Sequence, residues 1–295
     1  MSTALYHFVY NPIAGSGKSA RFRAALEAGL QSAGAEYAFH ETHSRREAID
    51  ITRKLTERQG GVIDIVAMGG DGTLNEVLNG MCDPAKVRLG IVPCGSGNDF
   101  ADAAGIPATP QGALDLILRG EARPTDYLEC GGVRGINAIG TGIDVEILRR
   151  YNRMKLLKGS AAYLASLIIT LISYKAREFA EIVDGREISH RAFIACAGNG
   201  KSIGGGIPIC PRAVIDDGLA DIVIVDNISR LGIPGALMKL MKRRVLELPT
   251  TAFRRDARLQ IRADGPMPIQ IDGEIFEDLP FDVRVVPGGL RVYRP

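Results

Sequence analysis

Apolar and polar positions follow a repeating pattern through the first part of the chain. Four apolar runs predict strands, at residues 5–10, 36–40, 63–68 and 88–92. Each precedes a segment with apolar residues at helical spacing, and these predict helices within residues 22–34, 45–58, 74–81 and 98–104. Strand and helix in alternation predict a parallel sheet with helices on both faces and ligands at the carboxyl ends of the strands.

The alternation of predicted strands and helices ends after Pro124. Strand-like segments then follow one another at residues 126–130, 136–140, 180–183, 192–197 and 221–225. Two helical stretches interrupt them, at residues 161–175 and 233–243. The pattern therefore predicts a second, mainly antiparallel domain and a division of the chain into residues 1–125 and 126–295.

Composition narrows the class of protein. The 295 residues are 46% apolar and 24% charged, as in globular proteins, and 36 basic against 34 acidic residues give a net charge of +2, which argues against nucleic-acid binding. Five cysteines without a C-x-x-C pair argue against a disulfide framework or a zinc site. With no signal-peptide pattern and no apolar run of bilayer-spanning length, we expect a cytoplasmic protein.

The first glycine-rich segment runs from Asn11 to Ser19 and ends like a Walker A loop. That loop needs glycine at the position of Pro12, so the P-loop interpretation fails. What remains is a strand ending in Asn11-Pro12, followed by a Gly/Ser turn whose backbone N–H groups can face an anion at a helix N-terminus. A plain strand-to-helix turn is the alternative.

The second segment, Gly69-Gly70-Asp71-Gly72-Thr73, directly follows an apolar run. Its glycines let the backbone approach a polyphosphate, while Thr73 and Asn75 offer side-chain hydrogen bonds at a helix start. Because a carboxylate among phosphates is repulsive, Asp71 implies a bridging divalent cation, with Mg²⁺ the obvious candidate. The alternative is a glycine-rich turn with an aspartate helix cap.

The third segment, Gly95-Ser96-Gly97-Asn98-Asp99, follows the next predicted strand. Parallel strands end at one edge of a sheet, so Ser96, Asn98 and Asp99 should lie at the same edge as Asp71. A helix start capped by Asn98 or Asp99 is the alternative.

These three segments together resemble the catalytic domain of the diacylglycerol kinase and sphingosine kinase family, particularly its short bacterial lipid kinases. The resemblance implies an α/β fold like that of NAD kinase and diacylglycerol kinase, with a parallel-sheet nucleotide-binding domain at residues 1–125 and a β-sandwich lipid-substrate domain at residues 126–295. It implies ATP contacts at Asn11, Thr42, Gly69, Gly70, Asp71, Gly72, Thr73, Leu74, Asn75 and Ser96. Asp99 and Asp126 match acidic positions that join Asp71 in an active-site network.

Two segments of the second domain extend the resemblance. Residues 214–221 are similar to the family's structural Mg²⁺ loop, with a carboxylate from Asp217 and backbone carbonyls from Val214 and Leu219. Residues 269–274 resemble the segment that holds the proton acceptor, which phosphoryl transfer to a neutral hydroxyl requires. Either Asp272 or Glu274 fits that role across a cleft from the nucleotide, and a solvent-exposed Asp-Gly hairpin turn is the alternative.

The function expected from the sequence is ATP-dependent phosphorylation of a lipid hydroxyl, with diacylglycerol as the leading substrate. Alternatives are phosphatidylglycerol, ceramide or a sphingoid base, an NAD kinase, or a nucleotide-binding regulator without turnover. The apolar helix at residues 161–174 and the basic stretch at residues 239–244 predict peripheral membrane contact, against a buried core helix and a solvated charged face. The resemblance also suggests a homodimer, and we expect Asp71→Ala and Asp272→Ala each to abolish transfer while leaving the fold intact.

Overall fold

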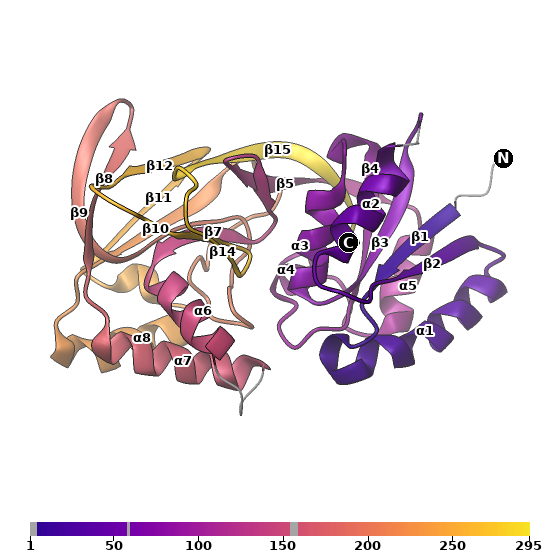
Figure 1. Cartoon of the computed structure of the whole chain (residues 1–295), viewed down its shortest axis with the longest axis horizontal. Coiled ribbons are helices and arrows are strands. Elements are labelled where there is room, and N and C mark those ends of the chain that lie inside the picture. Colours follow the sequence, from indigo (N-terminus) through magenta and orange to yellow (C-terminus); the bar gives the residue numbers. More distant parts are fainter. Residues whose placement is uncertain (1–4, 58–59, 154–158) are drawn as a thin grey trace. The chain divides into compact units, whose positions relative to one another are not determined.

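The computed structural model describes residues 5–57, 60–153 and 159–295 and divides the chain into two compact units (Figure 1). Unit 1 is Met1–Asp126 together with Gly288–Pro295, and unit 2 is Tyr127–Pro287. The division predicted from the sequence does not include the return of the last segment to unit 1. That return depends on a pairing between strands about 200 residues apart in sequence, which no local pattern signals.

Unit 1 contains the parallel sheet that the strand–helix repeat predicts. Its strands are β1 (Leu5–Tyr10), β2 (Glu36–Glu41), β3 (Ile63–Gly69) and β4 (Val87–Pro93), in the order β2-β1-β3-β4. The end of β15 (Asp282–Tyr293) adds to β4 in parallel. All seven residues of β3 are buried, since the strand is central and covered on both faces.

Helices cover the sheet of unit 1 in two pairs (Figure 1). The helix α1 (Ala14–Ser32) packs with α5 (Pro110–Leu118), and α2 (Glu47–Glu57) packs with α3 (Asp71–Gly80). Close packing of the first pair needs Gly29, because a Cβ there would lie 2.5 Å from the Leu114 side chain. The short α4 (Asp99–Ala103) and a 3₁₀ turn at Pro84–Lys86 complete the unit. The sequence pattern did not predict α5.

Unit 2 is built mainly from antiparallel strands. They are β5 (Ala122–Cys130), β6 (Val133–Gly135), β7 (Ala138–Gly142), β8 (Arg177–Val183), β9 (Arg186–Gly198), β10 (Ala220–Asp226), β11 (Thr251–Asp256), β12 (Arg258–Arg262), β13 (Ile269–Ile271), β14 (Glu274–Phe276) and β15. Neighbours run in the order β14-β13-β7-β9-β8-β12, and β10 joins β9 to β11. The chain passes between the units twice, within β5 and within β15.

Residues in the central strands of unit 2 alternate between two cores. On β10, Ala220, Ile222 and Ile224 belong to a core formed by side chains of the strands. Val223 and Val225 point to the other face, where a second core includes residues of the helices. Both faces are therefore buried, which explains why these strands are continuously apolar instead of alternating with polar residues.

Three helices pack on the second core: α6 (Ile143–Arg153), α7 (Gly159–Ser173) and α8 (Ile233–Met241). The sequence predicted two of them, and α6 is an addition that follows β7 without a loop. Short 3₁₀ turns at Arg230–Gly232 and Val245–Glu247 flank α8. Within the described ranges, no helix is long and apolar enough to cross a membrane.

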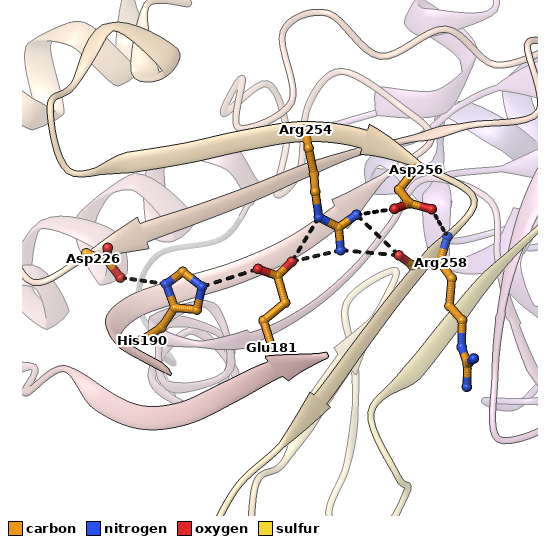
Figure 2. A network of polar contacts seen from close by, with 6 residues as sticks. All are labelled: Glu181, His190, Asp226, Arg254, Asp256 and Arg258. Atoms are coloured by element: carbon orange, nitrogen blue, oxygen red, sulfur yellow. Dashed lines mark hydrogen bonds and ion pairs between the residues drawn. The ribbon is translucent and has the colours of Figure 1, made fainter. Parts of the chain in front are cut away.

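A network of charged side chains connects the strands of unit 2 (Figure 2). His190 lies between two carboxylates, with Nε2 3.2 Å from Glu181 and Nδ1 3.2 Å from Asp226. Arg254 Nη2 lies 2.8 Å from the other oxygen of Glu181, and its Nη1 donates to Asp256 at 2.7 Å. Cations and carboxylates thus alternate across β10, β9, β8 and β11.

Candidate active site

The three glycine-rich loops of unit 1 meet at the carboxyl ends of β1, β3 and β4. Gly15 has a φ of +58°, and a Cβ there would lie 1.9 Å from the carbonyl oxygen of Cys94. A Cβ on Gly95 would lie 2.6 Å from the Cα of Gly70. The loops therefore touch backbone to backbone at positions that only glycine can occupy.

Asp71 holds the second loop to the third. Its Oδ2 accepts the N–H of Asn98 at 2.7 Å, and its Oδ1 accepts the N–H of Phe100 at 3.4 Å. Burial raises the pKa of this carboxyl, and the backbone N–H groups of Phe100 and Asn98 oppose that rise. Each carboxylate oxygen has a second lone pair, so Asp71 fits a cation site while keeping these two bonds.

Asn98 shapes the third loop. The backbone of Asn98 has a φ of +60°. Its Oδ1 accepts the N–H of Gly95 and its Nδ2 donates to the Gly95 carbonyl, both at 2.9 Å. The side chain closes the loop and makes no helix-capping bond, contrary to the alternative of an Asn98 cap. Asp99 begins α4 and is buried, whereas Ser96 is exposed.

The other predicted nucleotide residues lie around the same edge of the sheet. Asn11 Oδ1 accepts the N–H of Ile13 at 3.1 Å, and Thr42 donates through N and Oγ1 to the carbonyl of Tyr10, the residue before Asn11. Thr73 packs under the second loop, since a Cβ on Gly69 would lie 2.3 Å from its Oγ1. Leu74 and Asn75 are buried in α3, so Leu74 can offer a ligand only its backbone.

Asp126 lies on β5 and is 1% exposed. Its Oδ1 accepts the N–H of Gly288 at 2.6 Å, which holds the returning C-terminal segment of unit 1. The bond from Asp71 to the loop of Asp99 is direct, while a network that includes Asp126 stays a prediction.

In unit 2, Asp272 and Gly273 form the two-residue turn between β13 and β14, with φ values of +46° and +88°. The Asp272 carboxylate accepts three backbone N–H groups, from Ile136 at 2.6 Å and from Asn137 and Ala138 at 2.9 Å. The hairpin is therefore present, but its aspartate is anchored and half-buried. The alternative of a solvent-exposed turn does not describe this residue.

The same turn is connected to a buried acid. Gln270 Oε1 accepts the N–H of Gly273 at 3.0 Å, and its side chain lies beside Asp144 at the start of α6. Burial raises the pKa of Asp144 to about 7, against the opposing effect of the Val145 N–H and the Gln270 amide. The Asp144 carboxyl and the Gln270 amide therefore form one buried polar pair.

Asp144 borders an apolar cavity with about 710 Å³ of atom-free space, part of it open to solvent. All of its walls come from unit 2, and Asp144 is the one charged residue among them. The lining residues of the helices are Ile143, Ile147, Tyr163, Leu167, Leu171, Ile233, Ala236, Leu237 and Leu240. Strand and loop residues of the second core, among them Phe193, Ile194 and Val225, close the rest.

The predicted metal loop contains paired charges. Asp217 Oδ1 accepts the N–H of Leu219 at 3.1 Å, and Oδ2 pairs with Arg255. Arg255 Nε also lies 3.3 Å from Asp221, whose pKa burial raises to about 6 despite the arginine. Carboxylate and carbonyl oxygens are the donors that Mg²⁺ prefers, so the loop fits that ion in type. Among the described residues, no three His, Cys, Asp or Glu side chains gather to bind a metal, so backbone carbonyls of Val214 and Leu219 would be needed.

Sequence reasoning missed three of these residues. Asp144 lies two residues after the end of a strand, in the first turn of an amphipathic helix, and that placement is the signal that was available. Asp221 stands at the end of the metal-like loop. Gln270 has no sequence signal of its own, because its importance comes from Asp144, which is 126 positions away.

A parallel-sheet unit with three converging glycine-rich loops, followed in the chain by an antiparallel unit with an acidic turn, is the arrangement that the sequence predicts for a two-domain kinase. Comparison with known proteins agrees. The diacylglycerol kinase catalytic domain family matches residues 6–130, and the YegS C-terminal NAD kinase beta sandwich-like domain family matches residues 137–294. The chain therefore belongs to the diacylglycerol kinase family of lipid kinases, which confirms the resemblance and the fold class predicted from the sequence.

Individual relatives support this membership. A probable lipid kinase YegS-like protein of Xanthomonas oryzae is 36% identical over 252 residues, which cover 80% of each chain. A diacylglycerol kinase of Mycobacterium tuberculosis is 30% identical over 245 residues, covering 80% of this chain and 78% of the relative. The crystal structure of a diacylglycerol kinase from Bacillus anthracis superposes with a TM-score of 0.75 at 21% identity, covering 99% of this chain and 97% of the other, and shows the same fold. The chain is a kinase, and its family implies ATP as the phosphoryl donor.

Proposed function

We propose that this kinase transfers the γ-phosphoryl group of ATP to the hydroxyl of diacylglycerol and forms phosphatidic acid. The observation that carries the lipid assignment is the apolar cavity of unit 2, which Asp144 borders. An acyl chain matches the apolar walls.

Each step of the transfer has a candidate group. The loops around Gly15, Gly70 and Gly95 bind the phosphates through backbone N–H groups. A Mg²⁺ ion held by Asp71 would neutralise charge on the phosphates, and a second, structural ion would be held by Asp217, Val214 and Leu219.

The proton acceptor is Glu274 in this proposal. The carboxylate of Asp272 already accepts three backbone N–H groups, and these bonds anchor the turn. Glu274 is the other acid of the same hairpin and removes the proton from the lipid hydroxyl as the phosphoryl group arrives.

A sphingoid base is the second candidate substrate, because a buried carboxyl that borders an apolar cavity also suits an amine. A panel of diacylglycerol, phosphatidylglycerol, ceramide, sphingosine and NAD with radiolabelled ATP tests both. We expect diacylglycerol to give the highest kcat/KM. Labelled product from NAD alone would overturn the proposal.

Filling the cavity tests where the acyl chains bind. In Ala236→Phe the added ring occupies the cavity, so we expect at least a tenfold loss of kcat/KM for long-chain diacylglycerol and little loss for a short-chain analogue. Ala252→Phe, at an exposed position of β11, is the matched control and should behave like the unchanged protein. Equal losses for both chain lengths would mean that the cavity does not hold the lipid.

A further inference from the structure

The two helices beside the cavity expose large apolar side chains. Leu231 is 96% exposed, Ile172 67% and Met238 56%, and Ile168, Ile169 and Met241 are exposed as well. We call these six residues, on α7, α8 and the turn before α8, the α7/α8 face. Monomeric proteins seldom leave this many large apolar residues in solvent on neighbouring helices without a partner.

The exposed positions are the outer sides of helices whose inner sides line the cavity. On α7, Leu167 and Leu171 face inward while Ile168 and Ile172 face solvent. On α8, Leu237 lines the cavity while Met238 is exposed. Both helices belong to unit 2 (Figure 1). Both contribute walls to one cavity, so a single layer of helices separates the α7/α8 face from that cavity.

Cations border this face. Arg230, Lys242 and Arg243 are exposed, and within the described ranges their side chains form no ion pair. Arg244 is different, because Glu247 neutralises it through bonds of 2.8 and 2.6 Å, and Lys239 donates to the Glu247 carbonyl at 2.9 Å. Of the basic stretch at residues 239–244, only the exposed pair Lys242 and Arg243 therefore adds positive charge to that of Arg230 beside the α7/α8 face.

We propose that the α7/α8 face docks on a bilayer that contains anionic lipids. Its apolar side chains enter the interface between headgroups and acyl chains, and Arg230, Lys242 and Arg243 bind the headgroup phosphates. Docking would bring the helices that line the cavity against the layer in which the lipid substrate resides. This purpose rests on the proposed function, but binding to the bilayer does not.

Vesicle flotation of the full chain without nucleotide tests the docking. We expect binding to vesicles of phosphatidylcholine mixed with phosphatidylglycerol, and much weaker binding to phosphatidylcholine alone. Lys242→Gln combined with Arg243→Asn should weaken binding to the mixed vesicles about 25-fold, or about fivefold for each cation removed. Asparagine is chosen at Arg243 because that residue has a φ of +61°, which asparagine tolerates.

The apolar contribution needs its own variant. Leu231→Ser with Met238→Ser should lower binding at least tenfold on both vesicle types. Two control variants change exposed residues elsewhere. One combines Arg119→Gln with Arg186→Gln and the other is Val62→Ser, and both should bind like the unchanged chain. Thermal melts check that every variant is folded.

Three outcomes would reject the docking face: no flotation of the unchanged chain, equal binding of all variants, or a dimer that the serine variants convert to monomers. The last would show that a second copy covers the face. Activity on detergent-dispersed diacylglycerol is measured in parallel, so that a failure of docking and a failure of the proposed kinase reaction are separable. The docking variants should keep that activity.

Discussion

At the scale of single residues, Asp272 and Glu274 stand two positions apart but have different surroundings. The left-handed turn at Asp272 and Gly273 points the Asp272 carboxylate at the backbone before β7, where it accepts three N–H groups. These three bonds fix the position of the carboxylate and anchor the turn. Asp272 therefore has a structural task in addition to any part in transfer.

This geometry predicts that the two acids respond differently to substitution. Glu274→Gln should lower kcat at least 100-fold, through loss of the proton acceptor, with the free energy of unfolding unchanged. Asp272→Ala should also lose activity, and in addition should destabilise the protein by about 2 to 4 kcal/mol, because three backbone donors lose their acceptor. The expectation from sequence that Asp272→Ala leaves the fold intact is replaced accordingly. Turnover assays with denaturant unfolding measure both effects, and full turnover of Glu274→Gln would contradict the assignment.

At the scale of elements, the charged network of unit 2 joins strands that are distant in sequence (Figure 2). The hydrogen bond with Glu181 raises the pKa of His190, which favours its charged form. For Glu181, burial favours the neutral form, but His190 and Arg254 together hold its pKa below the usual range. Each charge in the network is therefore stable only while its neighbours are charged.

The raised pKa of His190 predicts a pH-dependent contribution to stability. It should be fully present below the unfolded-state value of 6.5 and lost as the pH rises through the higher folded-state value. His190→Gln should therefore lower the free energy of unfolding by about 1 to 2 kcal/mol at pH 6 and by less at pH 9. Melting curves of variant and unchanged protein over this range give the difference. His43→Gln, at an exposed histidine, is the control, and a pH-independent difference for His190→Gln would contradict the prediction.

At the scale of the whole molecule, the C-terminal segment completes unit 1. Leu290, Val292 and Tyr293 are buried there, and the Tyr293 hydroxyl donates to Asp64 at 2.5 Å. Asp64 also pairs with Arg88 at 2.5 Å, so one carboxylate connects β3, β4 and β15. Unit 1 thus depends on residues that follow the whole of unit 2.

Truncation after Pro287 should therefore unfold unit 1. Losing three buried side chains costs about 1.5 to 3 kcal/mol each, a sum comparable with the stability of a whole domain. We expect limited proteolysis to digest residues 5–126 rapidly while unit 2 stays resistant. Tyr293→Phe is a milder variant that should cost only about 1 to 2 kcal/mol. Unchanged protease resistance of the truncated chain would show that the segment is dispensable.

Much of the candidate site was accessible from the sequence because its signals are local. Gly69-Gly70-Asp71 and Gly95 to Asp99 each stand directly after an apolar run, and the rule that parallel strands end at one edge brings them together. The contact between Gly70 and Gly95, however, needed coordinates. So did the cavity and the contact between Asp144 and Gln270, because these two residues belong to elements separated by more than half of unit 2.

The sequence by itself determined the alternation of strand and helix, the glycine loops and the acidic turn, since each depends on spacing or on backbone freedom within a few residues. The tertiary structure decided which acid is anchored, which face of α7 and α8 is exposed, and that the last strand returns to the first unit. These depend on contacts between distant segments, whose free energies arise only when the chain has closed the loops between them.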